Sequence, residues 1–261
     1  SRKDLDEYTK FVSAYGAKGL LWFKFAADGT VSGPAAKFLK LEDIQALKKT
    51  ANVGNAGDLL FVVADQAKVV NDSLGSLRLK VGEKLGLIDK TKFNFLWVTG
   101  FPLLEYNTDD GRWYACHHPF TSPNPEDTEK LLSGKELGSI RAAAYDLVLN
   151  GVEVAGGSLR IYNQQVQTAM FRALGLSEEE AREKFGFFIE ALQYGTPPHG
   201  GMAFGMDRLV MILSGTDAIR EVMAFPKTQR GQCLMSDSPS AVTAEQLAEL
   251  HIGLRLPAKK V

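Results

Sequence analysis

The sequence predicts an α+β fold built in two parts. Over residues 1–88, segments with helical and with strand-like spacing of apolar residues alternate, which is typical of a small self-contained α+β module. From Phe93 onward, longer strands joined by explicit hairpin turns replace that alternation, and a glycine-spaced strand near residue 200 runs straight into a helix. We therefore place one domain at residues 1–90 and a second at residues 91–261.

Helical and strand spacing in the first part can be followed in chain order. Apolar residues recur at helical spacing over residues 3–15, where Gly16 ends the helix. The following elements are a strand at 19–25, a turn at 28–29, a helical piece at 34–38, a helix from 41, a strand at 59–64 and a helix that contains residues 74–81.

Turn dipeptides organise the second part. Asp110-Gly111 predicts a hairpin between residues 103–106 and 113–115, and Asn150-Gly151 predicts another between strands that start at Tyr145 and Val152. Residues 119–125 are predicted to form a loop, and residues 135–144 a helix. A later helix, residues 177–194, must end before Pro197 and Pro198, with Gly195 as its left-handed cap.

The register of the second hairpin suggests a metal site. A two-residue turn sets Leu147 opposite Val154 and Asp146 opposite Ala155, so Asp146 and Glu153 are diagonal neighbours on one face. Two such carboxylates repel unless they share a cation, and Mg²⁺ prefers hard oxygens and takes further oxygens from substrate phosphates. A polar strand facing solvent explains the same residues equally well.

Two glycines after this pair extend the polar face. Gly156-Gly157 inside a strand predicts a bulge, which would bring Ser158 and Arg160 onto the face of Glu153.

The glycine-spaced strand is suited to bind a planar, negatively charged ligand against its surface. Gly200, Gly201 and Gly205 allow close approach of a planar ring, and Arg208 falls in the first turn of the helix that begins at Met206. There a guanidinium can stack on a base and pair with phosphate. The alternative is that the glycines only serve packing and that Arg208 pairs with Asp207 or Glu221.

His117 and His118 stand together at the end of a predicted strand. Successive strand residues point to opposite faces, so at most one should reach a given pocket unless the strand twists. No metal-ligand spacing surrounds them, and histidines of the core or the surface are the plain alternative.

Composition excludes several classes of function. The chain has 261 residues, 45% hydrophobic and 23% charged, with a net charge of −1, so it lacks the bulk basicity of a general nucleic-acid binder. Cys116 and Cys233 form no disulfide or zinc pattern, and no apolar run is long enough for a membrane span. We expect a cytoplasmic protein without a membrane partner. The start at Ser1 rather than methionine suggests a fragment.

Several motifs resemble one enzyme family. Residues 201–209, GMAFGMDRL, resemble motif 3 of class II aminoacyl-tRNA synthetases, and residues 224–227 resemble the bacterial aspartyl branch. Residues 151–161 are similar to its strand that binds ATP and substrate, and residues 117–123 to its aspartate pocket. The first part resembles an insertion domain shared with an amidotransferase subunit. The second resembles the C-terminal half of the catalytic domain, an antiparallel sheet flanked by helices.

The resemblance implies roles for particular residues. Those implied are Arg208 and Glu153 in catalysis; Glu153, Gly205, Met206, Asp207 and Arg208 in ATP binding; Asp146 and Glu153 in metal binding; and His117, His118 and Arg160 in aspartate binding. It further implies ATP and Mg²⁺ as cofactors, a homodimer, and L-aspartate and tRNA as substrates. The tRNA is that for aspartate, with the tRNA for asparagine left open.

The expected function is that of an ATP-dependent, AMP-forming aspartate–tRNA ligase of which this chain is a C-terminal fragment. The family's motif 2 string Phe-Arg-x-Glu does not occur, so we expect the chain alone to be inactive. A non-catalytic module that docks tRNA is the alternative. A related asparaginyl enzyme or asparagine synthetase is disfavoured by the insertion domain and by the His-His-Pro-Phe segment.

Overall fold

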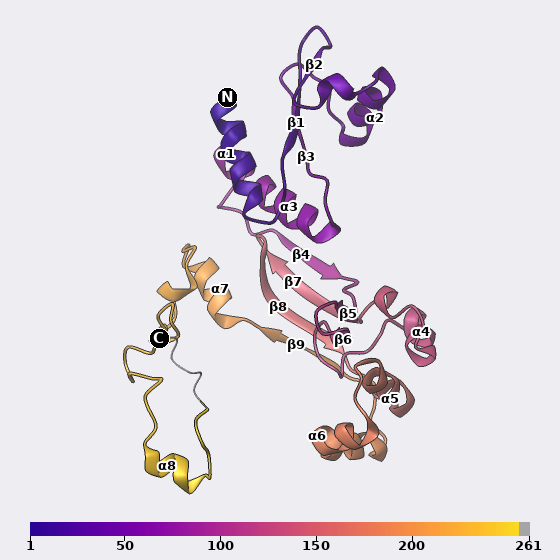
Figure 1. Cartoon of the computed structure of the whole chain (residues 1–261), viewed down its shortest axis with the longest axis vertical. Coiled ribbons are helices and arrows are strands. Elements are labelled where there is room, and N and C mark those ends of the chain that lie inside the picture. The colour runs from indigo at the N-terminus through magenta and orange to yellow at the C-terminus, as the bar shows by residue number, and fades with distance from the viewer. Residues whose placement is uncertain (256–261) are drawn as a thin grey trace. The chain divides into compact units, whose positions relative to one another are not determined.

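The computed structural model describes residues 1–255, and the chain divides into two compact units, Ser1–Lys92 and Phe93–Val261 (Figure 1). Within the described residues, no helix has both the length and the apolar content needed to cross a bilayer.

The first unit packs two long helices beside a small antiparallel sheet. Its elements are α1 (Arg2–Ser13), β1 (Leu21–Phe25), β2 (Val31–Ser32), η1 (Ala36–Phe38), α2 (Leu41–Ala51), β3 (Leu59–Val62) and α3 (Ala67–Lys84), with strand order β2-β1-β3. Ser1 caps α1, and its hydroxyl accepts from the backbone N–H of Asp4. Tyr8 and Val12 of α1 pack with Leu77 of α3 in a buried apolar cluster. The predicted elements of this part are confirmed, with ends shifted by a few residues.

The second unit is built on a four-stranded antiparallel sheet of order β4-β7-β8-β9. Its strands are β4 (Phe95–Thr99), β5 (Leu104–Asn107), β6 (Arg112–Ala115), β7 (Ala144–Leu149), β8 (Val152–Leu159) and β9 (Gly200–Phe204). Its helices and short 3-10 turns are η2 (Pro125–Asp127), α4 (Thr128–Ser133), η3 (Leu137–Ser139), α5 (Gln164–Ala173), α6 (Glu178–Ala191), η4 (Leu192–Tyr194), α7 (Met206–Leu213), η5 (Ile219–Glu221) and α8 (Ala244–Glu249). The apolar core of this unit contains Leu131 of α4 and Met170 of α5, and these two helices pack together (Figure 1).

Both predicted hairpins are confirmed. Strands β5 and β6 pair across the turn that contains Asp110-Gly111. Strands β7 and β8 pair across Asn150-Gly151, where both residues have positive φ, 49° and 82°, as a type I′ turn requires. The left-handed cap at Gly195 and the helix from Met206 are confirmed as well.

The helix predicted over residues 135–144 is wrong. The α-helix lies earlier, in α4, and ends at Gly134, whose φ is 69°. Only the short turn η3 follows before β7 begins at Ala144. Residues 141–142 are held in extended bridges to Pro102 and Pro123, so tertiary pairing overrides the local helical spacing.

The predicted position of the bulge is also wrong. Leu147 lies opposite Ala155 and Val148 opposite Glu153, so Val154 is the extra residue and Gly156-Gly157 continues the regular ladder. Asp146 consequently faces Gly156 rather than Ala155.

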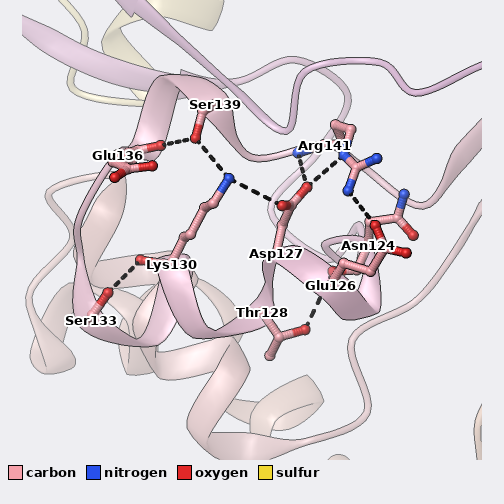
Figure 2. Close-up of polar contacts among 9 residues, drawn as sticks. All are labelled: Asn124, Glu126, Asp127, Thr128, Lys130, Ser133, Glu136, Ser139 and Arg141. Carbon is pink, nitrogen blue, oxygen red and sulfur yellow. Dashed lines mark hydrogen bonds and ion pairs between the residues drawn. The ribbon is translucent and has the colours of Figure 1, made fainter.

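A buried carboxylate ties the segment after the histidine pair to the entry of β7. Asp127, only 4% exposed, accepts from the backbone N–H and Nε of Arg141 at 3.1 and 2.8 Å, and pairs with Lys130 at 3.2 Å (Figure 2). The guanidinium of Arg141 lowers the pKa of Asp127 well below its usual range. Asn124 also donates its backbone N–H to the carbonyl of Arg141, at 2.8 Å. These bonds position residues 122–124 beside the sheet.

Candidate active site

A pocket of about 400 Å³ lies over β7, β8 and β9 in the second unit. Its lining includes seven site residues predicted from sequence: His117, His118, Asp146, Glu153, Arg160, Gly205 and Arg208. The predicted residues Met206 and Asp207 do not line it, and Met206 is 65% exposed. The pocket therefore brings together residues from the segment after β6, from β7, β8 and β9, and from the start of α7.

Two carboxylates meet over Gly156. A Cβ built on this glycine would lie 2.6 Å from Oδ1 of Asp146 and 3.2 Å from Oε1 of Glu153, so both carboxylates occupy the space above its bare Cα. Burial, and then the nearby charge of Glu153, raise the pKa of Asp146. The bulge at Val154 is what places Glu153 and Gly156 on one face.

The carboxylate pair suits a hard divalent cation. Both side chains offer oxygen ligands, and these oxygens lie close together over Gly156. Across residues 1–255 no group of three or more His, Cys, Asp or Glu side chains is arranged to hold a metal. A cation at this pair would take its other ligands from water or from phosphate oxygens.

Arg208 lies against this pair. Its Nη1 donates to the backbone carbonyl of Glu153 at 2.9 Å and forms an ion pair with the Glu153 carboxylate at 3.2 Å. The alternative partners considered from sequence, Asp207 and Glu221, are not the ones it contacts. The side chain of Arg208 remains 45% exposed, so the guanidinium can still contact an anionic ligand in the pocket.

Arg160 marks the other end of the pocket. Its Nη1 contacts both Nε2 of His118 and the hydroxyl of Ser158, which is only 2% exposed. Ser158, Arg160 and Glu153 thus share a face, as predicted, although the bulge responsible lies at Val154. The arginine is the group most suited to bind a carboxylate, because its planar fork matches two oxygens.

Two donors compete for the unprotonated nitrogen of His118. Nδ1 accepts the backbone N–H of Phe120 at 3.1 Å, whereas Nε2 contacts Nη1 of Arg160, a group that can only donate. Burial, and then the charges of Arg160 and His117, lower the pKa of His118, which favours the neutral imidazole with its single acceptor nitrogen. When Nδ1 accepts from Phe120, the proton lies on Nε2, and Nε2–H and the guanidinium are two adjacent donors that a carboxylate oxygen can satisfy.

Both histidines line the pocket, because the condition for only one to do so, a regular strand through both residues, is not met. Strand β6 ends at Ala115, and residues 116–117 bend, which removes the alternation of a regular strand. The ring of His117 packs edge-on against Phe101, with 5.2 Å between centroids.

One residue near the site was not singled out from sequence. Gln167 of α5 is 3% exposed, and its Nε2 donates to the carbonyl of Pro119 at 2.8 Å. The signal that could have found it is a polar amide at a helical position between the apolar residues Val166 and Met170.

In this antiparallel sheet, the glycine-rich edge strand β9 leads directly into α7, the helix that carries Arg208. This arrangement agrees with a class II tRNA synthetase. The family model described as "tRNA synthetases class II (D, K and N)" matches residues 10–229, and the chain belongs to this family.

Individual relatives are close in sequence. The chain is 56% identical over 260 residues to the "Aspartate--tRNA(Asp/Asn) ligase" of Bacillus anthracis, a match that covers 100% of this chain and 43% of that protein. It is also 56% identical to the protein of the same name from Geotalea uraniireducens, with 97% of this chain and 42% of that protein covered. The chain thus spans less than half the length of these relatives.

Solved structures give weaker matches. The aspartyl tRNA synthetase from Entamoeba histolytica is 19% identical, with a TM-score of 0.41, and the match covers 72% of this chain and 31% of that one. An asparaginyl-tRNA synthetase from Pyrococcus horikoshii is 20% identical, with a TM-score of 0.38 and coverage of 52% and 26%.

Proposed function

We propose that this chain forms one side of the aspartyl-adenylate site of an ATP-dependent, AMP-forming aspartate–tRNA ligase. The observation that carries the proposal is the convergence of a carboxylate pair, an arginine at a helix start and an arginine–histidine donor pair in one pocket. The 56% identity to proteins named aspartate–tRNA(Asp/Asn) ligases supports the same reaction. We extend to this protein the two tRNA classes in that name, and a cytoplasmic location.

In the reaction that we propose, an oxygen of the aspartate α-carboxylate attacks the α-phosphorus of ATP. The bond from that phosphorus to the bridging oxygen breaks, and pyrophosphate leaves. A hydroxyl at the 3′ end of tRNA then attacks the aspartyl carbonyl, AMP leaves with the bonding electrons, and the hydroxyl proton passes to the phosphate of the departing AMP. Both steps depend on positioning and charge stabilisation more than on acid–base chemistry.

The nucleotide end of the pocket is assigned to the groups around Gly156. Asp146 and Glu153 would hold Mg²⁺, which neutralises phosphate charge when bound. Arg208, whose Nη1 donates to the carbonyl of Glu153 at the start of α7, would contact a phosphate oxygen. Gly205, Met206 and Asp207 remain proposed neighbours of the nucleotide.

The amino-acid end is assigned to Arg160, His118 and His117. The guanidinium of Arg160 and Nε2–H of His118 would donate to the side-chain carboxylate of aspartate. Asparagine presents a neutral amide there, whose NH₂ group is itself a donor, so it leaves the guanidinium charge unpaired. Such a mismatch in a hydrogen-bonding site discriminates strongly between similar substrates.

Calorimetric titration of this chain with L-aspartate, in the presence of Mg²⁺ and ATP, tests the proposal. We expect aspartate to bind at least about tenfold more tightly than L-asparagine, and Arg160→Ala to weaken aspartate binding by at least about tenfold. Arg182→Ala, which changes an exposed arginine of α6 outside the pocket, should leave it unchanged.

Equal binding of the two amino acids, or an unaffected Arg160→Ala variant, would remove the assignment of Arg160. Binding of tRNA without any binding of ATP would instead favour a non-catalytic docking module.

A further inference from the structure

A buried amide lies directly behind the histidine end of the pocket. Gln167 projects from α5 and is 3% exposed, and its Nε2 donates to the carbonyl of Pro119 at 2.8 Å, across 48 positions of sequence. That carbonyl can only accept, so the nitrogen end of the amide is fixed chemically. The other end, Oε1, has no hydrogen-bond partner among the described residues.

The unpaired oxygen makes a purely structural role a poor explanation. A buried acceptor without a partner costs stability, whereas a methionine of similar length would fill the same space without that cost. What glutamine adds over methionine at this position is the bond from Nε2 to Pro119. The contact that distinguishes glutamine at this position is therefore the one with the Pro119 carbonyl.

Pro119 and Phe120 occupy the centre of a tight turn. The backbone N–H of Thr121 donates to the carbonyl of His118 at 3.1 Å, which closes a four-residue turn. A trans peptide unit is planar, and its C=O and N–H point in opposite directions. Holding the Pro119 carbonyl toward Gln167 therefore aims the N–H of Phe120 the opposite way, at Nδ1 of His118, which it reaches at 3.1 Å.

We propose that Gln167 is a positioning residue which, through the peptide unit between Pro119 and Phe120, sets the tautomer of His118 and so the donor pair that receives the substrate carboxylate. The chain of bonds runs from Nε2 of Gln167 through one peptide to Nδ1 of His118, and leaves Nε2–H of His118 at Arg160. Phe120 does not have positive φ, so the turn is not type II, a form that would place this residue in the left-handed region. Without Gln167, the Pro119 carbonyl loses its bond, and the peptide can tilt within its present turn form so that the bond from the Phe120 N–H to Nδ1 weakens. The inference rests on the proposed function only for the identity of the ligand.

The ring of Phe120 cannot replace this control. It packs against Phe171, Phe185 and Phe188, with centroid distances of 6.2, 5.2 and 4.6 Å, and so anchors the side chain. A tilt of the peptide before Phe120 leaves that anchor in place while moving the N–H. Packing and tautomer control are thus separable by experiment.

The test compares Gln167→Met and Gln167→Glu with Gln165→Met, a matched change at an exposed glutamine of the same helix. Long-range ¹H–¹⁵N spectra of the histidine rings report which nitrogen carries the proton. We expect Nε2–H for His118 in the unchanged chain and in Gln165→Met, and a mixture of both tautomers in the two Gln167 variants. Aspartate affinity should fall about tenfold in those variants, with ATP affinity within about twofold, because only one ligand end is displaced.

Two results would overturn the proposal. The first is an Nδ1-protonated His118 in the unchanged chain, which needs no variant at all. The second is a folded Gln167→Met variant whose His118 tautomer is unchanged, since the amide would then serve packing alone. If the unchanged chain binds no aspartate, the proposed function fails, while the tautomer comparison still decides the role of Gln167.

Discussion

At the scale of single residues, the pocket is shaped by charges that lack complete compensation. Glu153 is paired with Arg208, yet it also lies beside Asp146 over the bare Cα of Gly156. Burial and the charge of Glu153 disfavour the ionised form of Asp146. The folded chain thus carries electrostatic cost at this position, which a bound cation would remove.

We expect Asp146→Asn to stabilise the chain without Mg²⁺. Because the pKa of Asp146 is raised above its ordinary value of 3.8, its contribution to stability is complete below that value and declines as pH rises through the raised pKa. Near pH 7, the variant should melt roughly 2 °C higher than the unchanged chain, and the difference should vanish toward pH 3. Added Mg²⁺ should raise the melting temperature of the unchanged chain more than that of the variant.

Thermal denaturation between pH 3 and pH 8, with and without Mg²⁺, measures both effects. Asp6→Asn, at an exposed carboxylate of α1, is the control and should show neither. A destabilised Asp146→Asn variant at neutral pH would contradict the electrostatic account.

At the scale of elements, strand β8 organises the site. It pairs with β7 on one side and β9 on the other, and its bulge at Val154 sets which residues face the pocket. Its two adjacent glycines serve different purposes. Gly156 makes room for the carboxylates, whereas a Cβ on Gly157 would lie 1.9 Å from the backbone carbonyl of Gly201.

Gly157→Ala should therefore disrupt the pairing of β8 with β9. A backbone atom cannot move aside as a side chain can, so we expect a loss of about 2 kcal/mol in the free energy of unfolding, in the range of overpacked cores. Gly201→Ala is the matched control in β9, because no atom lies within 4 Å of the added Cβ, and it should be nearly neutral. Urea denaturation measures both, and equal stabilities for the two variants would refute the steric explanation.

At the scale of the whole molecule, the chain consists of two units with separate apolar cores. The first unit buries Tyr8, Val12 and Leu77, while the second buries Leu131 and Met170 in a core of its own. All residues that line the pocket belong to the second unit. We propose that the first unit is the insertion domain that its sequence resembles.

We expect residues 1–92 to fold when produced alone, because a domain with its own core can fold independently. The isolated unit should unfold cooperatively, within about 3 °C of the corresponding transition in the whole chain. Circular dichroism during heating measures this. An isolated unit without a cooperative transition would show that its stability depends on the rest of the chain.

Much of the fold could be predicted because local signals and tertiary structure agree. The type I′ turn at Asn150-Gly151 needs positive φ at both residues, and this dipeptide tolerates it, so the hairpin follows from sequence alone. The predicted helix over residues 135–144 failed because extended bridges to Pro102 and Pro123 outweigh weak helical spacing. The position of the bulge in β8 could not be predicted either, because it depends on the register in which β7 and β8 pair.

The sequence by itself determined the family, the hairpins and the residue types of the site, because these depend on local conformation and on motifs that lie within short segments. Only the tertiary structure decided which groups touch. It placed the bulge at Val154 and paired Arg208 with Glu153. It also brought both histidines to the lining of the pocket and bonded the Gln167 amide to the Pro119 carbonyl. Contacts between residues so distant along the chain are set by strand register and helix packing, which no local pattern encodes.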